Sequence, residues 1–285
     1  MRIMVSFEEV EGPEAVKPNI CCVIADSLRW DVFISSNPIN ILKLGKARKA
    51  YSIGNSTGPT MHGYLMNYPP IGIGEGLFIE GKSHLQGEQT IFYPFRRWMP
   101  KYFKSQGYFT IWMSANPIPI RMDQELDGIY QKYFNHWGAD EYQEMDVATP
   151  QIIKDLDLIV KLNKEQPIFA VILLLDTHSP YHDGEGKVHL IIPSKPEEGY
   201  ERQVRAATFI DDIFPNFINI FSRTERPTEF IFTSDHGENF GGSGWGHNSF
   251  MPTLQFGEKL FAIPFMRGRI DDWARFKVLI KEDEK

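Results

Sequence analysis

The chain has 285 residues, of which 42% are hydrophobic and 13% aromatic, so it is long enough to bury a large core and too apolar for an intrinsically disordered protein. Its formal net charge is −7 and its sequence pI is about 5.7, which excludes the basic footprint of a nucleic-acid-binding protein. An acidic chain can still bind a phosphorylated substrate, because a bound metal ion supplies local positive charge.

Residues 1–19 contain no apolar stretch of signal-peptide length, and no apolar run in the chain reaches the roughly 18 residues of a membrane span. These features predict a cytoplasmic protein without a membrane segment. The two cysteines, Cys21 and Cys22, are adjacent in the apolar run 20–25, ICCVIA. Because neighbouring side chains of a strand point to opposite faces, we expect both thiols to be core residues that do not pair with each other.

Short apolar runs bounded by polar residues are typical of buried strands in α/β proteins. The runs for which we expect parallel strands are 20–25, 108–114, 168–175, 229–234 and 260–265. Because helical patterns separate these runs, we expect an α/β fold with a central, mainly parallel sheet and helices on both faces.

Helical spacing of apolar residues marks the segments 92–107, 149–167 and 200–223. In the last of these, Pro215 predicts a kink or a break, because proline cannot donate the helical hydrogen bond. The segment 193–201, PSKPEEGYE, is rich in proline and charge, and we expect a loop there.

Two hydroxyl residues precede a Gly-Pro pair in the stretch 55–63, NSTGPTMHG. Pro59 suits the first turn of a helix, and a hydroxyl just before it faces the free N–H groups of the helix start. Thr57 is therefore either the cap of a turn or a nucleophile that attacks phosphorus. Ser56 is a rival nucleophile.

Carboxylates and imidazoles follow several of the expected strands. They are Asp26, Asp176, His178, Asp235, His236 and, in a glycine-rich stretch further on, His247. Ligands of open α/β sheets bind beyond the carboxyl ends of the strands, where gathered carboxylates repel one another unless a cation compensates. A mixture of Asp and His suits zinc or manganese, whereas calcium or magnesium prefers oxygen ligands alone. A metal ion beside Thr57 would also activate its weakly acidic hydroxyl.

Four segments resemble motifs of the sulfatase-like branch of the alkaline phosphatase superfamily. Residues 18–31, PNICCVIADSLRWD, are similar to its opening strand, and residues 175–181, LDTHSPY, to its D-x-H-x-P-Y segment. Residues 232–241, FTSDHGENFG, resemble its S-D-H-G-E segment, and residues 244–249, GWGHNS, its late G-H stretch. They occur in the order of the family and imply an alkaline-phosphatase/sulfatase-like fold over about residues 18–268.

This resemblance implies a single domain over residues 1–285, with a short or absent C-terminal extension. It also places Thr57 at the nucleophile position of the family motif C-x-P-S-R, in which true sulfatases convert the cysteine to formylglycine. Here the stretch is TGPTM, in which Thr57 replaces the cysteine, so formylglycine is not possible, and Met61 replaces the arginine. A threonine nucleophile is what the family's phosphodiesterases and phosphoethanolamine-type transferases use.

The resemblance also implies roles for the polar residues at the strand ends. One metal ion is expected to be bound by Asp26, Thr57, Asp235 and His236. The substrate phosphoryl group, or a second metal ion, is expected to be bound by His178 and His247, with Asp176. Because the matching set for a second metal is incomplete, we expect one tightly bound ion, zinc or manganese first and calcium or magnesium as alternatives.

The sequence therefore predicts a metal-dependent phosphoryl hydrolase that acts on a small phosphomonoester or phosphodiester, with Thr57 as nucleophile and His178 and His247 as catalytic residues. One alternative is a phosphoethanolamine-type or other phosphoryl or sulfuryl transferase. Another is a non-catalytic binding protein on the same fold. The substrate and the oligomeric state do not follow from the sequence.

Overall fold

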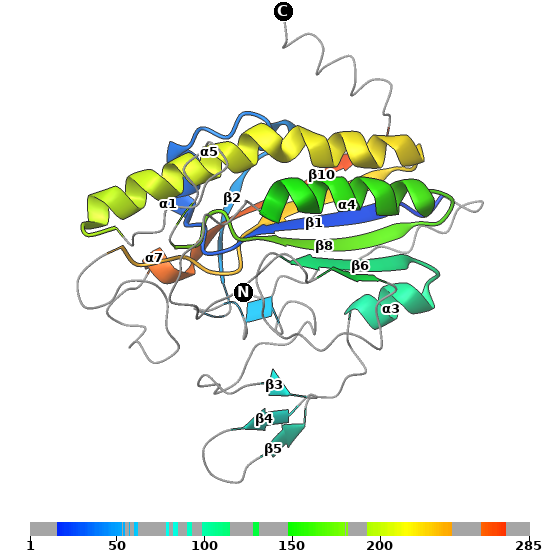
Figure 1. The fold of residues 1–285 in the computed structure, drawn as a ribbon, viewed down its shortest axis with the longest axis horizontal. Helices are drawn as coiled ribbons and strands as arrows, with labels where there is room; N and C mark the ends of the chain where they lie inside the picture. The colour runs from blue at the N-terminus through cyan, green and yellow to red at the C-terminus, as the bar shows by residue number, and fades with distance from the viewer. Residues whose placement is uncertain are drawn as a thin grey trace, which may run out of the picture.

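A seven-stranded sheet forms the centre of the protein (Figure 1). The computed structural model describes residues 16–52, 54, 57, 60–61, 78–79, 82–84, 90–92, 99–114, 128–130, 148–179, 181, 193–240 and 258–271. The strand order is β2-β10-β9-β1-β8-β6-β7. The bounds are β1 (Asn19–Ala25), β2 (Arg48–Tyr51), β6 (Phe109–Ser114), β7 (Gly128–Tyr130), β8 (Ile168–Leu174), β9 (Thr228–Thr233) and β10 (Ala262–Ile270).

The sheet is mainly parallel, as expected from its apolar runs. β1 pairs in parallel with β8 on one side and with β9 on the other, and β6 pairs in parallel with β8 and β7. β10 runs antiparallel to β9, so the expectation of a parallel strand at 260–265 is wrong. The first residues of that run belong to a short helix, α7 (Glu258–Phe261). An apolar run reports burial of a strand but not its direction, which depends on where the preceding connection crosses the sheet.

A small antiparallel sheet lies apart from the central one in Figure 1. It consists of β3 (Phe78–Ile79), β4 (Lys82–His84) and β5 (Thr90–Phe92). No strand was expected in this part of the chain, and residue 92, which was expected to begin a helix, ends β5. The strands are only two or three residues long, too short for a period-2 pattern to be recognised in the sequence.

Helices cover both faces of the central sheet, which confirms the predicted layering (Figure 1). One face carries α1 (Trp30–Ser35), α4 (Ala148–Leu162) and α5 (Pro196–Phe221), and the other carries α3 (Met99–Ser105). Cys21 and Cys22 face these two layers in turn, and both are free thiols, as expected. The 3-10 turns Ile41–Leu44 and Ser222–Thr224 follow α1 and α5 along the chain.

The helix α5 corrects two expectations from the sequence. It begins at Pro196, so most of the segment 193–201 is helical, and it continues through Pro215 without a break. Pro215 cannot donate a hydrogen bond to the carbonyl oxygen of Asp211, four residues earlier. The side chain of Asn40 donates to that oxygen at 3.2 Å instead, so the carbonyl group that Pro215 leaves without its helical donor is paired.

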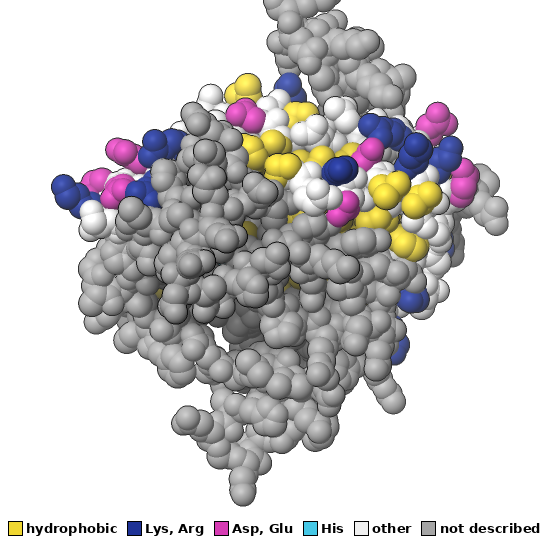
Figure 2. Space-filling view, in the orientation of Figure 1, with side chains coloured by type: hydrophobic (Ala, Val, Ile, Leu, Met, Phe, Trp, Pro, Cys, Tyr) yellow, Lys and Arg dark blue, Asp and Glu magenta, His cyan; other side chains and the backbone are white. Residues whose placement is uncertain are grey.

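The outer surface over α4 and α5 mixes charges of both signs with hydrophobic side chains (Figure 2). α4 leaves Leu158 and Leu162 exposed there. In the described part of the chain, no helix has the length and apolar character that crossing a bilayer requires.

Candidate metal centre

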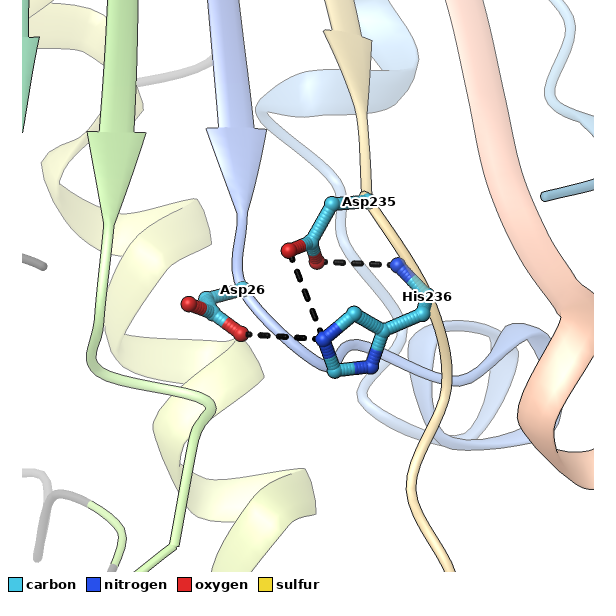
Figure 3. Close-up of side chains that lie close together, drawn as sticks. All are labelled: Asp26, Asp235 and His236. Atoms are coloured by element: carbon cyan, nitrogen blue, oxygen red, sulfur yellow. Dashed lines mark hydrogen bonds and ion pairs between the residues drawn. The ribbon is translucent and has the colours of Figure 1, made fainter. Parts of the chain in front are cut away.

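Three fully buried polar side chains converge beyond the ends of two central strands. Asp26 follows β1, and Asp235 and His236 follow β9, its parallel neighbour (Figure 3). Each contributes one possible ligand atom, and these atoms all lie within 4.8 Å of one another. Because parallel strands in register end at the same edge of a sheet, residues that are 209 positions apart meet here.

The spacing of the donor atoms suits a small divalent ion. His236 Nε2 lies 3.4 Å from Asp235 Oδ2 and 3.6 Å from Asp26 Oδ1. Thr57 Oγ1 lies 3.1 Å from the same nitrogen and 3.2 Å from Asp26 Oδ2. Ligands at about 2.0–2.1 Å around a tetrahedral zinc ion are separated from one another by about 3.3 Å. The four side chains therefore have the spacing of a metal-binding set.

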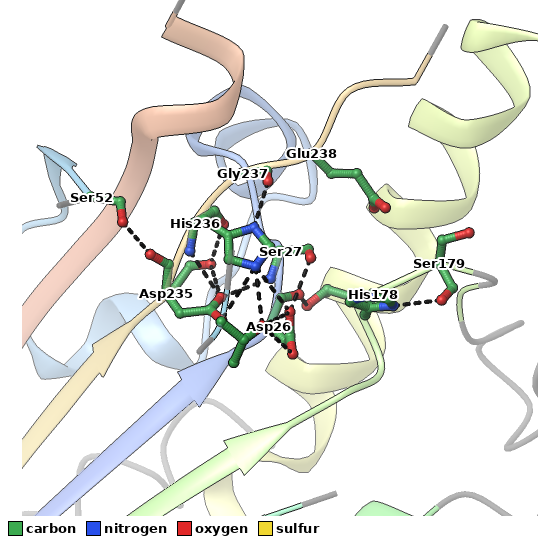
Figure 4. A network of polar contacts seen from close by, with 12 residues as sticks. Asp26, Ser27, Ser52, His178, Ser179, Asp235, His236, Gly237 and Glu238 are labelled. Carbon is green, nitrogen blue, oxygen red and sulfur yellow. Dashed lines mark hydrogen bonds and ion pairs between the residues drawn. The ribbon is translucent and has the colours of Figure 1, made fainter. Parts of the chain in front are cut away.

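The hydrogen bonds around His236 leave one ring nitrogen available as a ligand. Its Nδ1 donates to the carbonyl oxygen of Gly237 at 2.7 Å, so Nδ1 carries a proton (Figure 4). Nε2 faces Asp26, Asp235 and Thr57 and is the nitrogen that could bind a metal ion. A backbone acceptor that orients the ring in this way is common behind metal-binding histidines.

The carboxylate of Asp235 is only half satisfied by hydrogen bonds. Oδ1 accepts hydrogen bonds from the backbone N–H groups of Ser27 at 3.0 Å and His236 at 2.9 Å. Buried Oδ2 has no hydrogen-bond partner among the described residues. Burial, and next the nearby Asp26 carboxylate, raise the pKa of Asp235, and His236, the Ser27 N–H group and the Thr57 hydroxyl offset only part of this shift. A cation on Oδ2 would satisfy the oxygen and the charge together, so the residues present fit the expected metal ion.

His178 lies beside this cluster, in the turn that follows β8 (Figure 4). Its Nδ1 donates to the carbonyl oxygen of Ser179 at 2.5 Å. Burial acts to lower the pKa of His178, but the nearby carboxylates of Asp26 and Glu238 outweigh it, so the pKa is raised overall. The nearby carboxylates thus favour the charged form of His178 beside Asp26.

Other expected site residues are placed differently. Asp176 is buried and accepts a hydrogen bond from Thr149 of α4 at 2.6 Å, and it does not belong to the metal-ligand group. In the part of the chain that the structure describes, no second group of ligands is found. His247 and Ser56 lie outside the described residues, so the expected roles of both, and the count of one metal, stay predictions.

Several residues around the site were not expected from the sequence. Ser27, Thr177 and Gln203 link the loops that carry Asp26 and His178 by buried hydrogen bonds. Ser52 accepts a hydrogen bond from Gly54 N–H at 3.2 Å and donates to the carbonyl oxygen of Asp235. No sequence signal marks these partners, because buried Ser, Thr and Gln look like ordinary core or loop residues.

A comparison with protein-family models matches residues 18–275 to the model described as Sulfatase. The chain belongs to the sulfatase family. This confirms the resemblance that the sequence motifs indicated, and it covers the strands, the cluster and the segment of Thr57. Among curated proteins, no sequence matches this member of the sulfatase family.

Solved structures show the same fold. The sulfatase-family chain is similar to the C-terminal periplasmic domain of EptC from Escherichia coli in complex with Zn, with 17% identity and a TM-score of 0.59 over 91% of this chain and 78% of that one. It is similar to the soluble domain of lipooligosaccharide phosphoethanolamine transferase A from Neisseria meningitidis, with 11% identity and a TM-score of 0.63 over 92% and 79%.

A third similar structure is an alkaline phosphatase superfamily protein from Vibrio parahaemolyticus, with 17% identity and a TM-score of 0.56. The match covers 89% of this chain but only 60% of that protein. At these identities the likeness establishes the alkaline-phosphatase/sulfatase fold. Members of this superfamily are typically enzymes of phosphoryl or sulfuryl transfer, and several bind metal ions.

Proposed function

We propose that the protein is a metal-dependent phosphoryl hydrolase that uses Thr57 as its nucleophile on a phosphomonoester or phosphodiester. The observation that carries this proposal is the position of Thr57 Oγ1, 3.1 Å from His236 Nε2 and 3.2 Å from Asp26 Oδ2. The hydroxyl is 4% exposed, and its described partners are candidate metal ligands rather than backbone N–H groups. A residue that only capped a turn would direct its oxygen to the N–H groups of that turn.

Several residues of the chain contribute to an in-line displacement at phosphorus. Asp26, Asp235 and His236 would hold a zinc or manganese ion, which would supply Lewis acidity toward the Thr57 oxygen. Asp26 and His236 hold the Thr57 oxygen in place, and the Asp26 carboxylate is the nearest acceptor for its proton, because His236 Nε2 is a candidate metal ligand. His178 faces the same cluster, and its positive charge stabilises negative charge on the phosphoryl oxygens. His247 is proposed to act with it, as the family resemblance implies.

The choice of metal rests on the ligand set. Asp26 and Asp235 provide carboxylate oxygens and His236 provides a neutral imidazole nitrogen, a mixture that suits zinc or manganese better than calcium or magnesium. The zinc complex of the similar EptC domain supports zinc as the first ion to test.

A phosphoryl transferase is the second candidate, because two of the similar structures are described as phosphoethanolamine transferase domains or as EptC. Both reactions begin with attack by Thr57, which forms a phosphothreonine and releases the first alcohol. They differ in whether water or a second alcohol accepts the phosphoryl group. A hydrolase releases its second product, phosphate from a monoester or a phosphomonoester from a diester, in step with the alcohol. A transferase without acceptor releases about one equivalent of alcohol and then stops.

The experiment is a rate measurement on the zinc-loaded protein with aryl phosphomonoester, phosphodiester and sulfate ester substrates. We expect Thr57→Val to lower kcat on the phosphate ester by about a thousandfold or more, because covalent catalysis is lost. Thr60→Val is the matched control, since Thr60 is equally buried and its Oγ1 has no hydrogen-bond partner among the described residues. Equal rates for the two variants, or an active metal-free protein, would overturn the proposal.

A further inference from the structure

Gln203 joins two loops of the candidate site through a single side-chain amide. It lies in α5 and is fully buried. Its Nε2 donates to the carbonyl oxygen of Ser27 at 3.0 Å and to the carbonyl oxygen of Thr177 at 2.9 Å. Ser27 directly follows the candidate ligand Asp26, and Thr177 directly precedes His178. One amide therefore spans the metal-binding loop and the loop of the proposed phosphoryl-binding histidine.

The Ser27 end of this bridge is built into the metal cluster. Ser27 has a φ of 64°, in the left-handed region that residues other than glycine rarely adopt. In this conformation its N–H donates to Asp235 Oδ1 at 3.0 Å and its Oγ donates to Asp26 Oδ1 at 3.0 Å. The hydrogen bond from Gln203 to the Ser27 carbonyl oxygen holds the remaining polar group of this residue.

The Thr177 end is connected to the same ligand loop a second time. Thr177 Oγ1 donates to the carbonyl oxygen of Asp26 at 2.6 Å. The next residue, His178, donates its N–H to the carbonyl oxygen of Leu175 at 2.9 Å, which closes the turn after β8. Gln203 and Thr177 together form a latch between the loops of Asp26 and His178.

The chemistry of the latch requires a primary amide. Two carbonyl oxygens face the end of the side chain, and a neutral NH2 group offers the two protons that they need. This arrangement leaves Gln203 Oε1 buried and without a hydrogen-bond partner among the described residues. A side chain that served packing alone would not leave a buried oxygen unpaired. The glutamine at this position is therefore explained by the placement of the two carbonyl oxygens that it binds, and not by a gain in stability.

We propose that Gln203 is a positioning residue that fixes His178 relative to Asp26 and the metal site. The inference rests on the proposed function, because the consequence of the fixed spacing is alignment of the phosphoryl group with Thr57. Small displacements of aligned groups lower rates strongly even when the ligands remain in place. Loss of Gln203 is therefore expected to lower kcat more than it lowers metal affinity, since the three ligand side chains keep their other contacts.

The test compares Gln203→Met, which keeps the length of the side chain but removes the donors, with Asp211→Asn. Asp211 lies eight residues further along α5, a rise of about 12 Å, and its carboxylate accepts hydrogen bonds from Asn40 and Ile41, away from the site. Thr177→Val removes the other part of the latch and is the second variant. Each protein is measured with Zn²⁺ for melting temperature, Zn²⁺ affinity, kcat and hydrogen exchange of the Ser27 and His178 amides.

We expect both latch variants to lower kcat about tenfold or more and to keep the affinity for Zn²⁺ within about threefold of the wild type. The amides of Ser27 and His178 should exchange about tenfold faster in these variants than in Asp211→Asn. Exchange and kcat no different from those of the Asp211→Asn control would overturn the inference. Should Gln203→Met not fold, Gln203→Leu, which also lacks the donors to the Ser27 and Thr177 carbonyl oxygens, replaces it. If the wild-type protein turns over no ester, the proposed function fails, and the exchange of the two amides still decides whether the latch exists.

Discussion

The substitution Asp235→Asn distinguishes the contribution of Asp235 to metal binding from its contribution to the stability of the fold. Asparagine keeps an oxygen in the position that accepts hydrogen bonds from the N–H groups of Ser27 and His236. It replaces the unpaired Oδ2, which lies 3.4 Å from His236 Nε2, by an NH2 group. Burial and the nearby Asp26 carboxylate raise the pKa of Asp235, so a negative charge at this position costs stability in the metal-free protein. The neutral amide of asparagine removes that charge from beside Asp26.

The expected change in stability has opposite signs with and without metal. A buried acceptor without a donor costs about 1–3 kcal/mol, so the metal-free variant should be more stable than the wild type by about this amount. At about 2–4 °C per kcal/mol for a large domain, its melting temperature should rise by several degrees. Zn²⁺ at about 100 times its Kd should stabilise the wild type by about 2.7 kcal/mol, but should stabilise the variant far less, because a carboxylate ligand is lost.

The assay is thermal unfolding of wild type and variant in EDTA and in Zn²⁺, followed by calorimetry. Asp211→Asn is the control, because both carboxylate oxygens of Asp211 already accept hydrogen bonds and asparagine can only weaken them. It should lower the melting temperature in both conditions. A lower melting temperature for Asp235→Asn in EDTA would refute the reasoning about Oδ2. An undiminished gain in Zn²⁺ would show that Asp235 is not a ligand.

Two further predictions concern the segment of Thr57 and the core of the sheet. A Cβ atom at Gly54 would lie 2.5 Å from Thr60 Oγ1, so Gly54→Ala should displace the Thr57 segment, lower the free energy of unfolding by about 1–3 kcal/mol and lower kcat. Gly107 has a φ of 82°, so Gly107→Ala should also lower the free energy of unfolding, but its Cβ atom meets no atom within 4 Å and kcat should stay unchanged. Equal kcat values for the two variants would contradict this. Burial raises the pKa of Cys22 to about 12, so its thiol stays protonated at pH 8 and should resist alkylation by iodoacetamide until the protein is unfolded. Rapid labelling of the native protein, detected by mass spectrometry, would count against it.

The fold was largely predictable because its strands are buried on both faces. In β1 and β8 nearly every side chain is apolar and inaccessible, so each strand reads as a continuous apolar run. The direction of β10 and the continuation of α5 through Pro215 were not predictable. The first depends on how a connection crosses the sheet, and the second on Asn40, which lies 171 residues from Asp211 in the chain.

The expected site was predictable only as a set of residue types at strand ends. The structure brings Thr57, Asp26, Asp235 and His236 together, but it does not bring Asp176 into the metal-ligand group. The assignment of the whole chain to one domain and to the cytoplasm stays a prediction.

The sequence by itself determined the strand and helix pattern, the family motifs and the replacement of cysteine by threonine at position 57, because these features are local in the chain. The tertiary structure alone decided that Nε2 of His236 faces Thr57 Oγ1 and that Gln203 bridges Ser27 and Thr177. These contacts join residues 179, 176 and 26 positions apart. Their geometry depends on strand register and on the packing of α5 against the loops after β1 and β8, which no local pattern encodes.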